Sequence, residues 1–83
     1  MDDTVLVTFY YNKDANVDLE IPISISANDL VLALNQAYHL GIQTENIRNC
    51  YMIAENPIVL LKGNKTLEEL GIRNGSVIYY QGE

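Results

Sequence analysis

The sequence predicts an α+β fold in which a mixed five-stranded sheet packs on one α-helix, with a short helical turn before the last strand. Residues 4–11 and 17–23 carry the β-branched, aromatic and alternating side chains of strands, and residues 27–40 repeat apolar side chains at helical spacing. Three further strand-like runs occupy residues 50–54, 58–62 and 76–80. One sheet whose apolar face is covered by one helix accounts for all of them, with the first and last strands in the centre.

The first two strands are expected to form a hairpin. Residues 4–11 favour a strand by composition, and polar turn-forming residues follow them. In residues 17–23, apolar side chains alternate with Asp18, Glu20 and Pro22, which is the pattern of a half-buried strand with a charged outer face. Because Pro22 cannot donate a ladder hydrogen bond, this strand is expected to lie at a sheet edge or to end there.

The helix has signals at both ends. Ser26 can cap its first turn, and Asp29 completes a Ser-x-x-Asp variant of the capping box. Gly41 is placed to take the left-handed conformation that ends a helix, so a helix over about 27–40 is expected. The residues expected on its apolar face are Leu30, Ala33, Leu34, Ala37 and Tyr38.

The segment before the last strand is too short for an ordinary helix, so one helical turn is predicted. Thr66 is expected to cap that turn, and Gly75 to take a positive φ where the last strand begins. The residues expected to pack under the sheet are Leu67, Leu70 and Ile72.

The charge balance narrows the range of partners. Eleven Asp and Glu against five Lys and Arg give a net charge of −6, which repels nucleic acid and anionic membranes. The longest apolar run, residues 58–61, is too short to span a bilayer, so no direct membrane insertion is expected. Residues 1–3 are acidic where a signal peptide would be basic, and the single cysteine cannot form an internal disulfide. A cytoplasmic location is expected.

No catalytic, cofactor or metal-binding residues are predicted, and the protein is not expected to be an enzyme. An iron–sulfur cluster would need four cysteines, and only Cys50 is present. Cys50 would need a nearby base to act as a nucleophile, but the one histidine, His39, is expected at the end of the helix. Glu68 and Glu69 are adjacent on one turn and therefore diverge, so they are interpreted as a solvated face.

The segment Thr66–Tyr80, TLEELGIRNGSVIYY, resembles the stretch before the final strand of ubiquitin-like domains. The similarity extends to element order and spacing over residues 4–80. It implies a ubiquitin-like β-grasp, with residues 1–83 forming a single ubiquitin-like domain. Core residues carry the resemblance, so it predicts the fold and says little about function.

Among ubiquitin-like proteins, the chain resembles the bacterial YukD/EsaB family. The similarity lies in the Val-x-Val-Thr-Phe strand at Val5–Phe9, in the segment Asp18–Pro22 and in chain length. Members of that family are accessory proteins of type VII secretion systems. The resemblance implies a protein-binding adaptor with a regulatory or accessory role, whose partner is a component of that machinery.

Conjugation to other proteins is not expected. Ubiquitin-like modifiers and sulfur carriers need an exposed Gly-Gly end, whereas this sequence ends with Tyr80, Gln81, Gly82 and Glu83. Two alternatives stay open: a modifier or sulfur carrier with an atypical C-terminus, and a ubiquitin-like domain excised from a larger protein. The protein is expected to be a monomer or a weak homodimer.

The strand pattern also predicts a partner-binding surface. If alternate residues of the first and last strands face the helix, the remaining large side chains gather on the opposite sheet face, the part of the sheet that ubiquitin uses for recognition. The residues expected there are Leu6, Tyr10, Val77 and Tyr79, joined by Met52. Leu, Met and Tyr are typical of protein interfaces. The alternative is that Tyr and Val are simply good strand residues at half-exposed positions.

Overall fold

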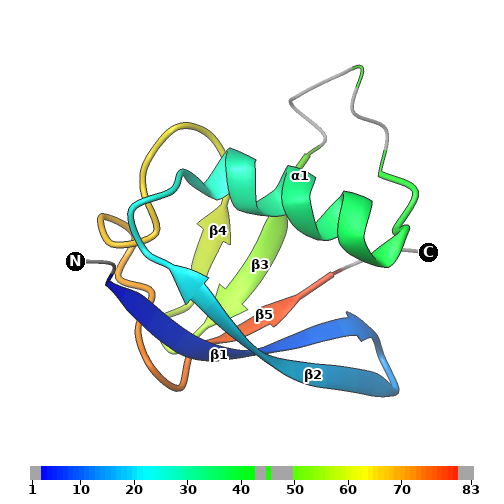
Figure 1. Cartoon of the computed structure of the whole chain (residues 1–83), viewed down its shortest axis with the longest axis horizontal. Coiled ribbons are helices and arrows are strands. Elements are labelled where there is room, and N and C mark those ends of the chain that lie inside the picture. Colours follow the sequence, from blue (N-terminus) through cyan, green and yellow to red (C-terminus); the bar gives the residue numbers. More distant parts are fainter. Residues whose placement is uncertain (1–2, 43–44, 46–49, 81–83) are drawn as a thin grey trace.

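The computed structural model describes residues 3–42, 45 and 50–80. Within them, five strands form one sheet in the order β2-β1-β5-β3-β4, and the helix α1 lies across one face of it (Figure 1). The elements are β1 Thr4–Asn12, β2 Ala15–Pro22, α1 Ala27–Tyr38, β3 Met52–Glu55, β4 Val59–Leu61 and β5 Val77–Tyr79. β1 and β5 are parallel and the other neighbours are antiparallel. The predicted α+β ubiquitin-like β-grasp is confirmed.

The hairpin of β1 and β2 forms as its pattern predicted. Val7 pairs with Leu19, and the register shifts between Tyr10 and Asn12 as the strands approach the turn. The Asn12 side chain stabilises that turn by accepting a hydrogen bond of 2.8 Å from the backbone N–H of Asp14. β2 is an edge strand and ends at Pro22, so the proline leaves no gap in a central ladder.

The helix begins at its predicted cap and ends earlier than expected. The Ser26 hydroxyl accepts a hydrogen bond of 3.1 Å from the backbone N–H of Asp29. At the other end, His39 takes the left-handed conformation, with φ 54°, and its N–H bonds the carbonyl of Asn35. The helix therefore stops at Tyr38, and Gly41 is not its cap, although its φ is also positive. Histidine is among the residues that tolerate this conformation better than most.

The helix face turned to the sheet differs from the predicted one. Leu30 and Leu34 are buried as expected, but Val31 is buried where Ala33 had been expected. Ala33 and Ala37 are exposed. The helix could turn either Val31 or Ala33 toward the sheet beside Leu30 and Leu34. Burying the larger valine removes more apolar surface from water.

Residues 66–72 form consecutive hydrogen-bonded turns instead of the single predicted helical turn. Thr66 caps them, since its hydroxyl accepts from the backbone N–H of Glu69. Leu67 and Ile72 are buried, whereas Leu70 is only partly buried and is not the core residue that was predicted. Gly75 has the expected positive φ, 92°, and its N–H bonds the carbonyl of Leu6, which holds the start of β5 beside β1.

The core lies between α1 and the sheet. It is built from alternate residues of every strand, from one side of the helix and from the turns before β5. Its buried members are Val7, Phe9, Ile21, Ala27, Leu30, Val31, Leu34, Cys50, Met52, Ala54, Leu61, Leu67, Ile72 and Ile78. The other strand positions point away from the helix, and we call the surface they form the outer face.

Candidate protein-binding face

Two aromatic side chains meet on the outer face, on two neighbouring strands in the interior of the sheet. Tyr10 of β1 and Tyr79 of β5 are register partners on parallel neighbouring strands, so their side chains project side by side. Their rings stack with centroids 5.0 Å apart and planes 20° from parallel. The backbone N–H of Tyr80 donates to the Tyr10 carbonyl at 3.0 Å and fixes this register.

The tyrosine pair belongs to a longer apolar row that crosses four strands. Tyr79 is paired with Ile53 of β3, and Ile53 is paired with Leu60 of β4. The apolar row, Tyr10, Tyr79, Ile53 and Leu60, therefore runs across β1, β5, β3 and β4. Leu60 is 48% exposed at one end of it. Leu6 adds a second exposed leucine on β1, with 53% of its surface open to solvent.

A second row beside the first is polar and ends in carboxylates. Thr8 of β1 pairs with Asp18 of β2 on one side and Val77 of β5 on the other, and Val77 pairs with Glu55 of β3. We call Asp18, Thr8, Val77 and Glu55 the acidic row. Two residues back along β1, on the same face, Leu6 pairs with Glu20.

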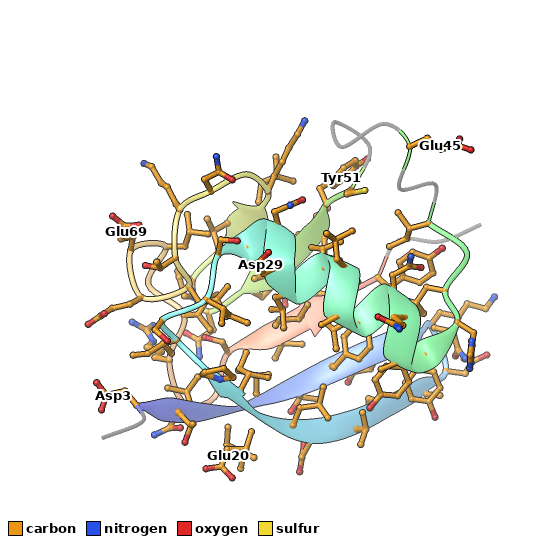
Figure 2. The ribbon with its side chains drawn as sticks, turned by 45° about the horizontal axis from the view of Figure 1, so that its top comes forward. Asp3, Glu20, Asp29, Glu45, Tyr51 and Glu69 are labelled. Atoms are coloured by element: carbon orange, nitrogen blue, oxygen red, sulfur yellow. The ribbon has the colours of Figure 1, made fainter. Side chains whose placement is uncertain are left out.

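Hydrogen bonds hold these carboxylates in place. The Thr8 hydroxyl donates to Asp18 Oδ1 at 3.1 Å, and the Thr4 hydroxyl donates to Glu20 Oε2 at 2.7 Å. Glu20 extends from β2 away from α1 (Figure 2). A side chain that is already ordered loses less entropy when it pairs with a partner, so both acids suit a binding surface.

Glu55 connects the two rows. The Tyr79 hydroxyl donates to Glu55 Oε1 at 3.2 Å. Partial loss of solvent around the phenol raises the pKa of Tyr79, and the hydrogen bond to Glu55, its negative charge and Tyr10 raise it further. The neutral, donating form of Tyr79 is therefore favoured at this site.

Four of the five predicted surface residues lie on the outer face: Leu6, Tyr10, Val77 and Tyr79. Met52 does not, because it is fully buried and pairs with buried Leu61 on the core side. Along β3, successive side chains alternate between faces, so burial of Met52 and Ala54 places Ile53 and Glu55 outward. Sequence reasoning missed Ile53 and Leu60. Strict alternation through β3 and β4, with small Ala54 taken as an inward residue, is the signal that could have found them.

The candidates for chemistry are separated from this face. Cys50 is buried, two residues before β3, and His39 is the exposed cap of α1. In the part of the chain that the structure describes, no group of three or more His, Cys, Asp or Glu side chains could hold a metal ion. Among the same residues, no helix is long and apolar enough to cross a membrane.

Comparison with known proteins agrees with the fold. Residues 4–79 match the family described as "WXG100 protein secretion system (Wss), protein YukD". No curated protein sequence matches the chain. The match extends from the first residue of β1 to the last residue of β5 and so covers all six elements. The chain therefore belongs to the YukD family, the ubiquitin-like proteins associated with WXG100, or type VII, secretion.

Proposed function

We propose that this protein is a cytoplasmic adaptor that binds another protein of the type VII secretion system through the outer face of its sheet. The stacked pair of Tyr10 and Tyr79 is the observation that carries the proposal. Rigid aromatic side chains at the centre of a surface are the anchors that dominate binding energy in protein interfaces. The YukD match supports a protein of this secretion machinery as the partner.

The surroundings of the tyrosine pair support the same surface. Ile53 and Leu60 extend it into a continuous apolar row, and Leu6 lies exposed on β1 beyond the acidic row. Apolar side chains gathered on one side and bordered by polar ones are typical of interaction sites, whereas exposed leucines scattered singly are not. The acidic row provides that polar border.

The opposite side of the molecule offers weaker anchors. The exposed positions of α1 include Asp29, Ala33, Gln36 and Ala37, which are small or polar. Figure 2 shows Asp29 on the helix, on the side of the sheet opposite the outer face. Small side chains contribute little area to an interface, so the helix is the less favoured surface.

Binding measurements with single variants test the proposal. Purified proteins of the same secretion system would be titrated one at a time against the parent protein and against Tyr79→Ser. Loss of a central aromatic anchor should weaken binding by about thirtyfold or more. Gln36→Ala, on the exposed side of α1, is the matched control and should bind as the parent does. Equal affinity of the Tyr79→Ser variant for the partner would show that the outer face is not the interface.

The alternative function, covalent attachment, has its own test. Modifiers and sulfur carriers present a Gly-Gly end to their activating enzymes. The 83 residues contain no pair of adjacent glycines. We propose non-covalent binding, so incubation with ATP and such an enzyme should leave the mass of the chain unchanged. An adenylate, a thioester or a series of larger conjugates would favour the modifier instead.

A further inference from the structure

We infer that the outer face takes an amphipathic helix of a partner protein, lying along the apolar row with lysine or arginine side chains over the acidic row. This inference rests on the proposed function and specifies the partner's chemistry. It follows from the spacing of the rows, from the signs of their charges and from the charge of the whole molecule.

The spacing fits a helix. Neighbouring strands lie about 4.8 Å apart, so the four residues of the apolar row, Tyr10, Tyr79, Ile53 and Leu60, present a side chain at about that interval. A helix presents side chains of one face about once per turn, every 5.4 Å or so. Side chains on one face of an extended strand recur at nearly 7 Å, which fits the interval less well. Crossing the row takes about three turns of helix.

The charges of the outer face determine which side of the partner helix should carry positive residues. The outward strand positions hold three carboxylates, Asp18, Glu20 and Glu55, and no Lys or Arg. Asp18 and Glu55 stand at the two ends of the acidic row, parallel to the apolar one. A helix seated on the tyrosines therefore has one side over these acids, where positive side chains are favoured and negative ones repelled.

The same charges disfavour a second copy of this chain as the occupant. Stacking two outer faces would bring together the carboxylates of both copies, including Asp18 and Glu20, which threonine hydroxyls already hold in place. Each chain also carries a net charge of −6. Like charges brought into one interface oppose its formation, so the partner is a different and more basic protein.

Three synthetic helical peptides test the inference. The first has leucines at helical spacing along one face and lysines along one flank. The second replaces those lysines by glutamates, and the third keeps the composition of the first but scrambles the order. Each would be titrated into nitrogen-labelled protein while amide resonances are followed by NMR. The lysine peptide should shift the signals of Tyr10, Ile53 and Tyr79, and the glutamate peptide should bind about tenfold more weakly or worse.

Variants of the acidic row sharpen the test. Asp18→Asn and Glu55→Gln keep the shape of each side chain and remove its charge, so each should weaken the lysine peptide about two- to fivefold. The loss should disappear at high salt, because salt screens such pairs. Glu68→Gln removes one charge from the turns before β5, away from the outer face, and should leave binding unchanged.

Four outcomes would overturn the inference: equal binding of the lysine and glutamate peptides, equal binding of the scrambled peptide, shifts confined to α1, or a dimer in sedimentation that Tyr79→Ser dissociates. The proposed function and this inference can fail independently of each other. If Tyr79→Ser abolishes binding of a secretion protein while no peptide binds, the adaptor role stands and only the helical, basic partner is wrong.

Discussion

Thr66 and Glu69 cap each other at the start of the turns before β5. The backbone N–H of Thr66 donates to Glu69 Oε1 at 2.8 Å, and the backbone N–H of Glu69 donates to the Thr66 hydroxyl at 3.1 Å. The backbone bond from Thr66 is the largest cause that lowers the pKa of Glu69. A bond from the Thr66 hydroxyl and the charge of Lys65 act in the same direction.

Glu69→Ala should destabilise the protein at neutral pH and much less in acid. Because the folded-state pKa is lowered, the stabilising contribution is complete above the unfolded pKa and is lost as pH falls through the folded one. Urea denaturation of parent and variant at neutral and acid pH measures this change. Glu69→Gln can still accept the bond from Thr66 but should lack the acid-dependent part. An equal destabilisation by Glu69→Ala at both pH values would contradict the prediction.

Leu67→Ala should lower the free energy of unfolding by about 2–5 kcal/mol, because it leaves a cavity at a fully buried position. That is a large part of the stability of a small domain, which is typically about 5–15 kcal/mol. Leu70→Ala is the matched control: the same change at a partly buried site should cost less. Thermal melts of the two variants would show the difference, and equal shifts would mean that Leu67 is not the anchor of this segment.

Met52 and Ile53 are neighbours on opposite faces of β3, so the same substitution should act differently on them. Met52→Glu would bury an unpaired charge in the core and should unfold the protein. Ile53→Glu changes the apolar row and should leave the circular dichroism spectrum intact while binding to the partner is lost. A folded Met52→Glu variant would refute the assignment of the two faces.

Tyr79 should ionise at higher pH than an ordinary tyrosine. Partial desolvation is the main cause of the raised pKa, followed by the bond to Glu55 and its charge. Since the folded-state pKa is raised, the stabilising contribution of the neutral phenol is complete below the unfolded pKa and is lost as pH rises through the folded one. NMR of the ring carbons measures the titration, and Glu55→Gln should move the pKa of Tyr79 back toward the ordinary value. Glu68→Gln should not.

Local patterns predicted the elements well, because their causes lie within a few residues of one another. The alternation of apolar and charged residues in β2 and the caps at Ser26 and Thr66 are of this kind. The errors arose where distant segments decide. Val31 rather than Ala33 faces the core because of how the helix sits on the sheet, which no helical spacing specifies. Leu70 is only partly buried for a similar reason, whereas Leu67 and Ile72 are buried as predicted.

The outer face was predictable in part. Tyr10 and Tyr79 lie on strands whose inward residues are plainly apolar, so their direction could be inferred. β3 has four residues and β4 three, and Met52, Ile53 and Leu60 are all apolar, so small Ala54 and charged Glu55 are the main signs of direction in β3. A shift of one residue exchanges the faces, and in the structure the pairing with β5 sets the register to which Ala54 and Glu55 point.

The parallel pairing of β1 with β5 joins the two ends of the amino-acid sequence. Tyr10 belongs to the first strand and Tyr79 to the last, yet their rings touch (Figure 1 shows the two strands side by side). Contacts between such distant segments form late, since a long stretch of chain must close before they contribute. Because Tyr79 is the last residue of β5, nearly the whole domain must also be synthesised before the tyrosine pair can form. A partner that requires this pair discriminates against nascent and truncated chains without any separate quality-control step.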